Sequence, residues 1–328
     1  MKKIFPQKLQ KGDEIRVVSP SLSFSIISKE NQERASEKIK ELGYKLSFGE
    51  NINEIDEFQS SSVESRIQDL HQAFSDQNVK MVLTTVGGDN SNQLLKYIDW
   101  NLIKNNPKIF CGFSDITVLN NAIYAKTGLI NYSGLCYVDF SGGNCFDYSL
   151  EYFEKCLIKN ENFEVLPSKE WSDNVWYIPA KDQKIVNNTG FWIINEGEAK
   201  GTILGGNINS FALLKGTEYF PDLTDSIIFI EDCNEASIPT FDRDLQSLVL
   251  LPDFPKVKGI LVCRFQNGSK ATQERLVKII KNKKELDGIP VIANVDFGHT
   301  APIITFPIGG TTEIKAIDGE AEIRIIEH

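Results

Sequence analysis

Three side chains that are far apart in the sequence, Ser114, Glu231 and His299, could together catalyse acyl transfer. A serine hydroxyl attacks a carbonyl when a base removes its proton, and the usual base is a histidine, whose ordinary pKa is about 6.5. A carboxylate then orients the imidazole and stabilises its charged form. These residue types form a complete set for a serine hydrolase if the fold brings them to one place.

Ser114 lies at the junction of an apolar strand, predicted at 108–113, and a helix, predicted at 115–128. A strand-to-helix turn exposes the hydroxyl, and the helix N-terminus favours negative charge that develops beside it. The alternative is that Ser114 only caps the helix, since serine is a preferred N-cap residue. The G-x-S-x-G motif is incomplete, because Ile116 stands in place of the second glycine.

His299 is the candidate base among the three histidines. His71 lies within a predicted amphipathic helix, and His328 is the last residue. His299 follows an apolar strand and Glu231 ends another, so both are expected at the carboxyl ends of strands, where α/β proteins place their sites. Asp232 is the alternative to Glu231. Either carboxylate could instead be a solvated surface charge, and His299 an ordinary loop residue bonded to the backbone.

Gly87 and Gly88 end another apolar strand, within the stretch "TTVGGDNSNQLL". Glycines let backbone N–H groups approach a ligand closely, so this turn could bind the oxyanion that forms during acyl transfer. We expect the N–H groups of Gly88 and Asp115 to donate to that oxyanion. The alternative is a plain tight turn. A dinucleotide site is not indicated, because the sequence has neither G-x-G-x-x-G nor the lysine of a phosphate-binding loop.

The elements that must position these residues alternate between short apolar strands and amphipathic helices in the first half of the chain. This alternation is typical of a parallel sheet with helices on both faces. One helix is predicted at 29–42, where Ala35, Ile39 and Leu42 form a single apolar stripe and Gly43 follows as a cap. The chain ends in an alternating pattern around an Asp-Gly turn, which predicts a β-hairpin.

A length of 328 residues favours two domains over one. We expect a doubly wound N-terminal domain at 1–160, which carries the nucleophile. A linker and loop segment is expected at 161–199, where the pattern loses its period. A C-terminal α/β domain at 200–328 would carry Glu231 and His299.

Composition and charge exclude several classes of protein. Hydrophobic residues make up 41% and charged residues 24% of the chain, as in an ordinary globular protein, and no apolar run reaches the length of a membrane span. A net charge of -10 without a basic cluster would repel nucleic acid. The six cysteines lack metal-binding spacing, so we expect reduced thiols and neither metal nor other cofactor. The first residues lack the apolar stretch of a secretory signal, which favours a cytoplasmic location.

The sequence resembles the LD-carboxypeptidase family of serine peptidases, which includes the microcin C self-immunity peptidases. The resemblance rests on six stretches that occur in order over nearly the whole chain: "VVSPS", "TTVGGDNSNQLL", "GFSDITVL", "GTILGGNINSFALLKGTEYFPDL", "IFIEDCNE" and "DFGHTAP". It implies a Rossmann-like N-terminal domain with a parallel sheet, a C-terminal domain of the swivelling β/β/α type, a catalytic triad divided between the two, and a homodimer.

The resemblance also implies roles for single residues. Ser114 would be the nucleophile, His299 the general base and acid, and Glu231 the residue that orients His299. Gly88 and Asp115 would form the oxyanion hole.

Three further residues are expected at the substrate: Gly87, Asn207 and Trp176. Asn207 ends a glycine-rich stretch that matches the family's loop before the first helix of the second domain. Trp176, together with Trp171, lies in an aromatic segment similar to the loop with which the immunity-type members stack a nucleotide. Two tryptophans in a linker could equally pack between domains.

The substrate class stays open between two kinds of amide. Murein-recycling members often carry an arginine before the double glycine and Tyr-Gly after it, whereas this sequence has Val86 and Asp89-Asn90, which favours the immunity-type branch. We expect a peptidase that cleaves a C-terminal amide beside a D-amino acid of a muropeptide or beside a nucleotide. Arg243 and Arg264 are candidates for binding a substrate carboxylate, although Arg243 could instead pair with a neighbouring aspartate. Competing classes are a non-catalytic protein that binds a peptide or small molecule between its domains and a nucleotide-dependent oxidoreductase.

Overall fold

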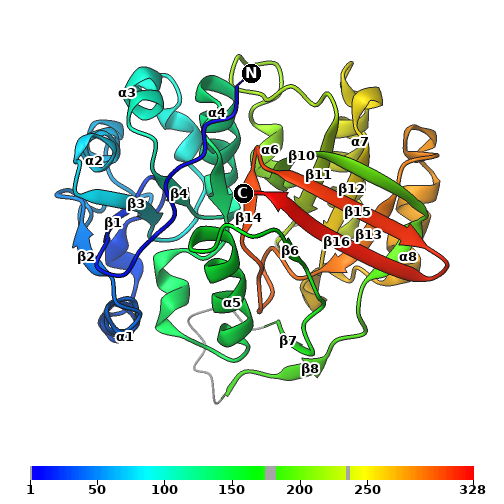
Figure 1. Cartoon of the computed structure of the whole chain (residues 1–328), viewed down its shortest axis with the longest axis horizontal. Helices are drawn as coiled ribbons and strands as arrows, with labels where there is room; N and C mark the ends of the chain where they lie inside the picture. The colour runs from blue at the N-terminus through cyan, green and yellow to red at the C-terminus, as the bar shows by residue number, and fades with distance from the viewer. Residues whose placement is uncertain (1, 174–181, 234–236) are drawn as a thin grey trace.

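Two β-sheets lie side by side in the structure, one in each half of the molecule, and helices pack against both (Figure 1). The computed structural model describes residues 2–173, 182–233 and 237–328. The sheets have six and eight strands, and a two-stranded ribbon accompanies them. The predicted fold class is confirmed: a mixed α/β fold with a parallel sheet in the N-terminal half and a second sheet in the C-terminal half.

The first sheet has the strand order β14-β5-β4-β3-β1-β2, and strands β1 to β5 run parallel. Its strands are β1 (Glu14–Val18), β2 (Lys45–Phe48), β3 (Val79–Thr84), β4 (Ile109–Cys111), β5 (Asn131–Ser133) and β14 (Phe306–Ile308). All residues of β4 and β5 are buried, as expected for central strands that helices cover on both faces. β14 comes from the C-terminal half and pairs antiparallel with β5, so this sheet joins the two halves.

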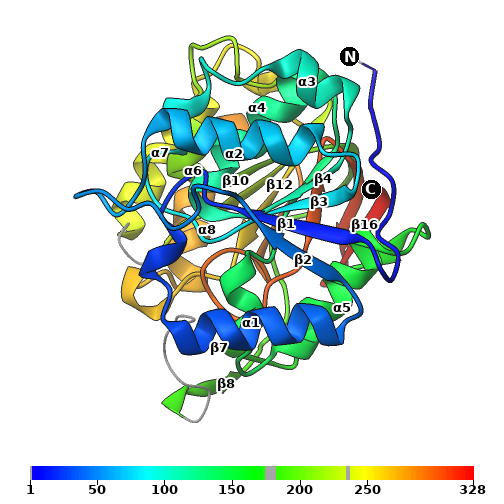
Figure 2. The same cartoon turned by 90° about the vertical axis from the view of Figure 1, so that its left-hand side faces the viewer.

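Helices cover both faces of the first sheet, and Figure 2 shows α1 and α2 on opposite sides of β1 and β2. The helices of this half are α1 (Lys29–Glu41), α2 (Val63–Ser75), α3 (Trp100–Asn105), α4 (Thr117–Thr127) and α5 (Phe146–Leu157). The helix predicted at 29–42 is confirmed as α1, with Ala35 and Ile39 in the core. It begins where Ser28 accepts a hydrogen bond from the Asn31 N–H, and Gly43 follows its end with a φ of +92°.

The second sheet has the order β6-β16-β15-β10-β11-β12-β13-β9, and strands β10 to β13 run parallel. Its strands are β6 (Phe163–Glu164), β9 (Trp192–Asn195), β10 (Gly197–Asn207), β11 (Ser226–Glu231), β12 (Gly259–Cys263), β13 (Val291–Val295), β15 (Thr311–Ile317) and β16 (Glu320–Glu327). Its helices are α6 (Ile208–Ala212), α7 (Ile238–Val249) and α8 (Gln273–Lys281). The predicted terminal hairpin is β15–β16, whose turn residues Asp318 and Gly319 both have the positive φ that a two-residue hairpin loop requires.

The stretch 161–199 differs from the linker and loop that its sequence predicts. β6 and β9 form the two edges of the second sheet, while β7 (Glu170–Ser172) and β8 (Ile185–Asn187) pair with each other. None of these four strands is longer than four residues. Strands this short at sheet edges show no clear alternation of apolar and polar residues, which is why the pattern missed them.

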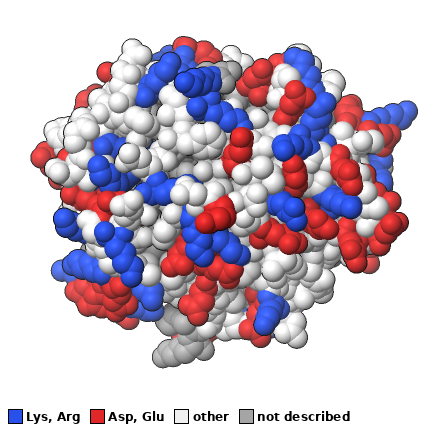
Figure 3. Space-filling model, viewed as in Figure 1, with Lys and Arg blue, Asp and Glu red and all other residues white. Residues whose placement is uncertain are grey.

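Acidic and basic side chains are interspersed over the face of the molecule in Figure 3. A polyanion would therefore meet carboxylates on this face as well as ammonium groups. No helix among the described residues is both long enough and apolar enough to cross a lipid bilayer.

Candidate active site

The turn between β4 and α4 places Ser114 where a buried strand leads into a helix, as predicted. Ser114 has a φ of +64°, a left-handed conformation that residues other than glycine adopt at an energetic cost. It opens a short 3₁₀ turn, η3 (Ser114–Ile116), and the residue that precedes α4 is Ile116. Ser114 is therefore not the N-cap of α4, and the capping alternative does not hold.

Two hydrogen bonds join Ser114 to Glu231 through His299. His299 Nε2 lies 3.0 Å from Ser114 Oγ, and His299 Nδ1 lies 2.7 Å from Glu231 Oε2. Glu231 is the last residue of β11 and is 2% exposed, whereas His299 lies on the loop that follows β13. Gly298 lets this loop approach β11 closely, since a Cβ at that position would lie 2.9 Å from Glu231 Cβ. Residues from three different strand ends thus converge.

The surroundings of His299 prepare it to accept the proton of Ser114. A Glu231 carboxylate can only accept a hydrogen bond, so His299 Nδ1 carries the hydrogen and Nε2 is left to accept from the Ser114 hydroxyl. Burial by itself lowers the pKa of His299, but attraction to Glu231, and also to Asp232 and Asp139, holds that pKa above its ordinary value. The imidazolium that forms when Ser114 gives up its proton is therefore stabilised.

Asp232, the alternative partner for the imidazole, bonds other groups. Its Oδ1 accepts from Asn209 Nδ2 and from the Cys233 N–H, each at 2.9 Å. Burial and the adjacent charge of Glu231 raise the pKa of Asp232 to about 7. Glu231 is thus the carboxylate that contacts His299, and Asp232 acts on His299 through its charge alone.

Gly87 and Gly88 follow β3 and lie against the turn that carries Ser114. A Cβ on Gly87 would lie 2.8 Å from Ser114 Cβ and 3.5 Å from the Asp115 backbone nitrogen, so only glycine allows this approach. Gly88 lines the same cavity as Ser114, and its φ is +148°. Within the described part of the chain, neither the Gly88 nor the Asp115 N–H donates a hydrogen bond to another backbone group. This leaves room for the oxyanion hole expected at Gly88 and Asp115, which stays a prediction.

The side chain of Asp115 ties this turn to its neighbours. Its buried carboxylate accepts from Ser21 Oγ at 2.6 Å and from the Ser91 N–H at 2.9 Å, while the Asp115 carbonyl accepts from Ser91 Oγ at 2.9 Å. Arg66, 4% exposed, adds hydrogen bonds to Pro20 O and to Asn90 Oδ1. These bonds hold residues 20–21 and residues 90–91 in fixed positions relative to Asp115, the residue after Ser114.

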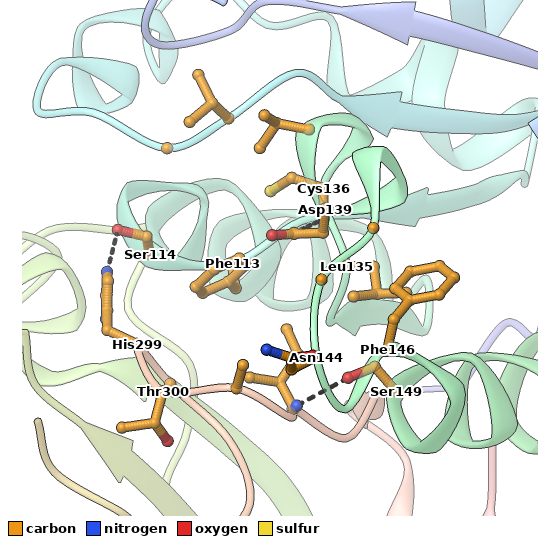
Figure 4. Close-up of a pocket in the computed structure, with 18 of the residues that line it drawn as sticks. Phe113, Ser114, Leu135, Cys136, Asp139, Asn144, Phe146, Ser149, His299 and Thr300 are labelled. Carbon is orange, nitrogen blue, oxygen red and sulfur yellow. Dashed lines mark hydrogen bonds between the residues drawn. The ribbon is translucent and has the colours of Figure 1, made fainter. Parts of the chain in front are cut away.

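Ser114 and His299 line one side of a cavity of about 410 Å³, which Figure 4 shows in close-up. Its walls are mostly apolar, and the apolar side chains include Ile26, Val86, Phe113, Leu135, Phe146 and Ile303. The ring of Phe113 packs against His299 with a centroid distance of 5.5 Å. The cavity can therefore exclude water around a substrate whose carbonyl faces Ser114.

Some of the residues expected at the substrate do not line this cavity. Asn207 ends β10, and its Oδ1 accepts from the Ser210 N–H at 3.0 Å and so caps α6; it is not among the residues that line the cavity, and its contact with substrate stays a prediction. The adjoining Gly205 exchanges two hydrogen bonds with the side chain of Asn121 on α4, which makes this stretch a joint between the two halves. Arg243 is exposed and pairs with Asp244 at 3.3 Å.

The aromatic segment contains Trp171 and Trp176. Trp176 lies outside the described residues. Trp171 is on β7, where the guanidinium of Arg264 lies 5.2 Å from its ring centroid. Arg264 also forms a buried ion pair with Asp296 at 2.6 Å. Neither Arg264 nor Trp171 lines the cavity that holds Ser114.

Sequence reasoning missed the wall of the cavity that follows β5. This wall includes Asp139, on the 3₁₀ helix η4 (Tyr137–Ser141), and continues through Asn144 to Ser149 on α5. The available signal was a second pair of glycines, Gly142 and Gly143, soon after a strand end.

The sequence and fold match known proteins over almost the whole chain. Two family models match, that of the LD-carboxypeptidase N-terminal domain at residues 15–134 and that of the LD-carboxypeptidase C-terminal domain at residues 200–314. "Putative carboxypeptidase YocD" of Bacillus subtilis (strain 168) is 50% identical over 99% of this chain and 100% of its own. The crystal structure of an MccF-like protein from Bacillus anthracis str. Ames superposes with a TM-score of 0.98 and 50% identity, covering 99% of this chain and 100% of that one.

A more distant relative has been solved with a ligand. The microcin C7 self-immunity protein MccF of Escherichia coli is 33% identical over 91% of this chain and 89% of its own. A structure of an MccF in complex with aspartyl sulfamoyl adenosine gives a TM-score of 0.89 at 30% identity, covering 99% of both chains. With both family models matched in order and these identities along its length, the chain belongs to the LD-carboxypeptidase family of serine peptidases.

Proposed function

We propose that this peptidase hydrolyses a C-terminal amide bond through a covalent acyl-enzyme on Ser114. The observation that carries the proposal is the pair of hydrogen bonds, 3.0 Å and 2.7 Å long, that link Ser114 Oγ, His299 and Glu231. His299 is the general base and acid in this proposal, and Glu231 orients it. The Gly88 and Asp115 N–H groups bind the oxyanion, where one such donor typically lowers the barrier by about 3 kcal/mol.

The proposed reaction has two halves. As Ser114 Oγ attacks the scissile carbonyl, its proton moves to His299 Nε2, which then gives it to the leaving nitrogen so that the C–N bond breaks. A water molecule attacks the resulting ester while His299 takes one of its protons; His299 then gives that proton to Ser114 Oγ as the C–O bond of the ester breaks and the carboxylic acid leaves. Glu231 keeps Nδ1 protonated throughout and stabilises each imidazolium.

The favoured substrate is an aminoacyl-nucleotide. Its aminoacyl part would be transferred to Ser114, and its nucleotide part would be the leaving group. Support comes from the identities of 50% to an MccF-like protein and 33% to MccF, against 28% to a probable murein peptide carboxypeptidase. Val86 and Asp89-Asn90, where murein-recycling members often differ, add to it. Further support comes from the MccF structure that holds aspartyl sulfamoyl adenosine, an aminoacyl-nucleotide analogue. The alternative is the L,D-peptide bond at the end of a murein tetrapeptide. A parallel assay that compares kcat/KM for an aspartyl-adenylate amide and for such a tetrapeptide decides between the two leaving groups.

Covalent labelling tests the enzyme mechanism without knowledge of the substrate. We expect a fluorophosphonate to add its mass to the peptide that contains Ser114, and Ser114→Ala to abolish the labelling. We also expect Ser114→Ala to lose about 10⁶-fold in kcat. A folded protein that is not labelled, and hydrolyses neither substrate, would instead be the non-catalytic binding protein.

The homodimer and the cytoplasmic location that the resemblance and the sequence imply stay predictions. Light scattering on the eluted peak of a size-exclusion column measures the first, and fractionation of the cells measures the second. A monomer at micromolar concentration would contradict the dimer.

A further inference from the structure

A carboxylate projects into the cavity from the wall opposite the loop of His299. Asp139 lies on η4, and Figure 4 shows its side chain directed across Phe113 toward the side of the cavity that holds Ser114. Its Oδ2 accepts from the Cys136 N–H at 2.7 Å and so caps η4. Its Oδ1 has no hydrogen-bond partner among the described residues, although it belongs to a side chain that lines the cavity.

Among the described residues, no lysine or arginine pairs with this carboxylate. No lysine or arginine is found among the described residues that line the cavity. The other titratable groups of that lining are His299, which must be neutral to act as a base, and the Cys136 thiol, whose pKa burial raises to about 12. Burial raises the pKa of Asp139 to about 6, so the group is still an anion at neutral pH. An unpaired carboxylate in an apolar cavity is costly, and a cation from the substrate would offset that cost.

We infer that Asp139 binds a primary ammonium group on the residue whose carbonyl Ser114 attacks. The inference rests on the proposed function, and it names a feature that both substrate classes can share. In an aminoacyl-nucleotide the group is the α-ammonium next to the scissile carbonyl, and in a peptide with a basic acyl residue it is the side-chain ammonium. Three N–H donors on a point charge suit the free Oδ1, which accepts but cannot donate.

Matched ligands on the Ser114→Ala protein separate this binding from catalysis. We expect aspartyl sulfamoyl adenosine to bind about 10- to 100-fold more tightly than its twin without the amine, succinyl sulfamoyl adenosine, when both are titrated by calorimetry. Asp139→Asn in the same background retains an oxygen that can cap η4 but removes the charge. We expect it to bring the two affinities within about twofold, with the twin's own affinity unchanged.

A second capping aspartate provides the matched control. Asp99 Oδ1 accepts from the Leu102 N–H at 2.9 Å at the start of α3, and Asp99 does not line the cavity. Asp99→Asn should leave the preference for the amine intact. Equal affinity for the twins in Ser114→Ala, no binding of either, or equal weakening of both by Asp139→Asn would each overturn the inference.

A pH series needs no substitution at Asp139 and covers the case in which Asp139→Asn does not fold. In the Ser114→Ala protein the preference for the amine should fade as the pH drops through about 6, where Asp139 gains a proton. The α-amine stays charged over this range. Protonation of His299 would also disfavour an ammonium relative to the twin without the amine, so the same series on the protein with both Ser114→Ala and His299→Gln isolates the contribution of Asp139. A preference that persists at pH 4.5 contradicts the inference. Failure of the proposed function would appear separately, as absence of hydrolysis by the unmodified enzyme.

Discussion

The two sides of the active site are organised by different physical means. On the side of the first sheet, neutral hydrogen bonds and one well-bonded carboxylate hold Ser114 and the double glycine in place, with Asp115 accepting from Ser21 and Ser91. On the side of the second sheet, carboxylates lie close together with oxygens that have no described partner, Glu231 Oε1 and Asp232 Oδ2. The hydrogen bonds on the side of the first sheet fix the position of the nucleophile. The carboxylates on the side of the second sheet determine how firmly His299 holds its protons.

This difference indicates which substitutions act through geometry and which act through charge. A geometric defect should lower kcat without moving the pH profile, because it leaves in place the carboxylates of Glu231, Asp232 and Asp139 that raise the pKa of His299. A substitution that removes a charge but spares the contacts of His299 should move the pH profile and change kcat little. The predictions below test that division.

The largest effect is expected for Glu231→Gln, which removes the charge of the residue that directly contacts His299. The amide can still touch His299 but favours the wrong tautomer and leaves the imidazolium without its anion, so we expect kcat to fall about 10⁴-fold. Asp232→Asn leaves the 2.7 Å contact of Glu231 intact and should cost less than tenfold. Initial rates on the better of the two substrates measure both. Similar losses in the two variants would mean that the site uses the acidic pair as a unit.

A purely geometric defect comes next, in Gly87→Ala. The added Cβ would lie 2.8 Å from Ser114 Cβ, so the nucleophile must move, and a misplacement of about 1 Å costs about 100-fold in kcat. The pH profile should keep its position. Gly216→Ala is the control: its φ of +76° makes the substitution strained, but nothing lies within 4 Å of the new methyl group and the site is untouched. Full activity of Gly87→Ala would show that the turn is more pliable than its contacts indicate.

A smaller loss, about tenfold in kcat, is expected for Asp115→Asn. Ser21 and Ser91 both donate to the same carboxylate oxygen, Oδ2, so an amide oxygen can accept both bonds but without the charge that strengthens them. The Asp115 N–H is then held less firmly without being removed. KM should stay within twofold. The control is Asp69→Asn, another buried aspartate, which bonds Asn51 away from the cavity and should lower the melting temperature alone. An unchanged kcat for Asp115→Asn, or an equal loss in the control, would contradict a role in positioning.

The same division explains what could be predicted from the sequence. Ser114 was recognisable because it stands between the uninterrupted apolar run that contains β4 and the 11-residue helix α4. His299 was recognisable because only three histidines compete for the role. Both belong to elements whose local sequence determines where they end.

Asp139 and the 161–199 segment were missed for the opposite reason. η4 is five residues long and β6 is two, so neither is long enough to show a period, and their positions depend on tertiary contacts. The residue pattern alone did not decide between Glu231 and Asp232; only the resemblance to the family favoured Glu231. Adjacent residues on a strand point to opposite faces, and only the packing of the His299 loop against β11 decides which face matters.

The smallest effect, and the one that isolates charge, is a shift of the pH profile in Asp232→Asn. Activity requires neutral His299, so the rate rises with pH through the pKa of His299, which lies above its ordinary value. Because the charge of Asp232 helps to raise that pKa, its removal should move the rising limb of kcat/KM toward lower pH. Asp253→Asn, which removes an exposed aspartate paired with Lys256, should not shift it.

The steepness with which kcat/KM rises with pH tests the coupling between Asp232 and His299. The pKa of Asp232 is about 7, so Asp232 and His299 lose their protons over overlapping ranges and the wild-type limb should be broader than a one-proton curve. Ionisation of Asp232 then holds the proton on His299 more firmly as the pH rises. In Asp232→Asn the limb should sharpen to a single proton. A limb that neither moves nor sharpens would show that the charge of Asp232 does not reach His299, and the second side would then act through the Glu231 contact alone.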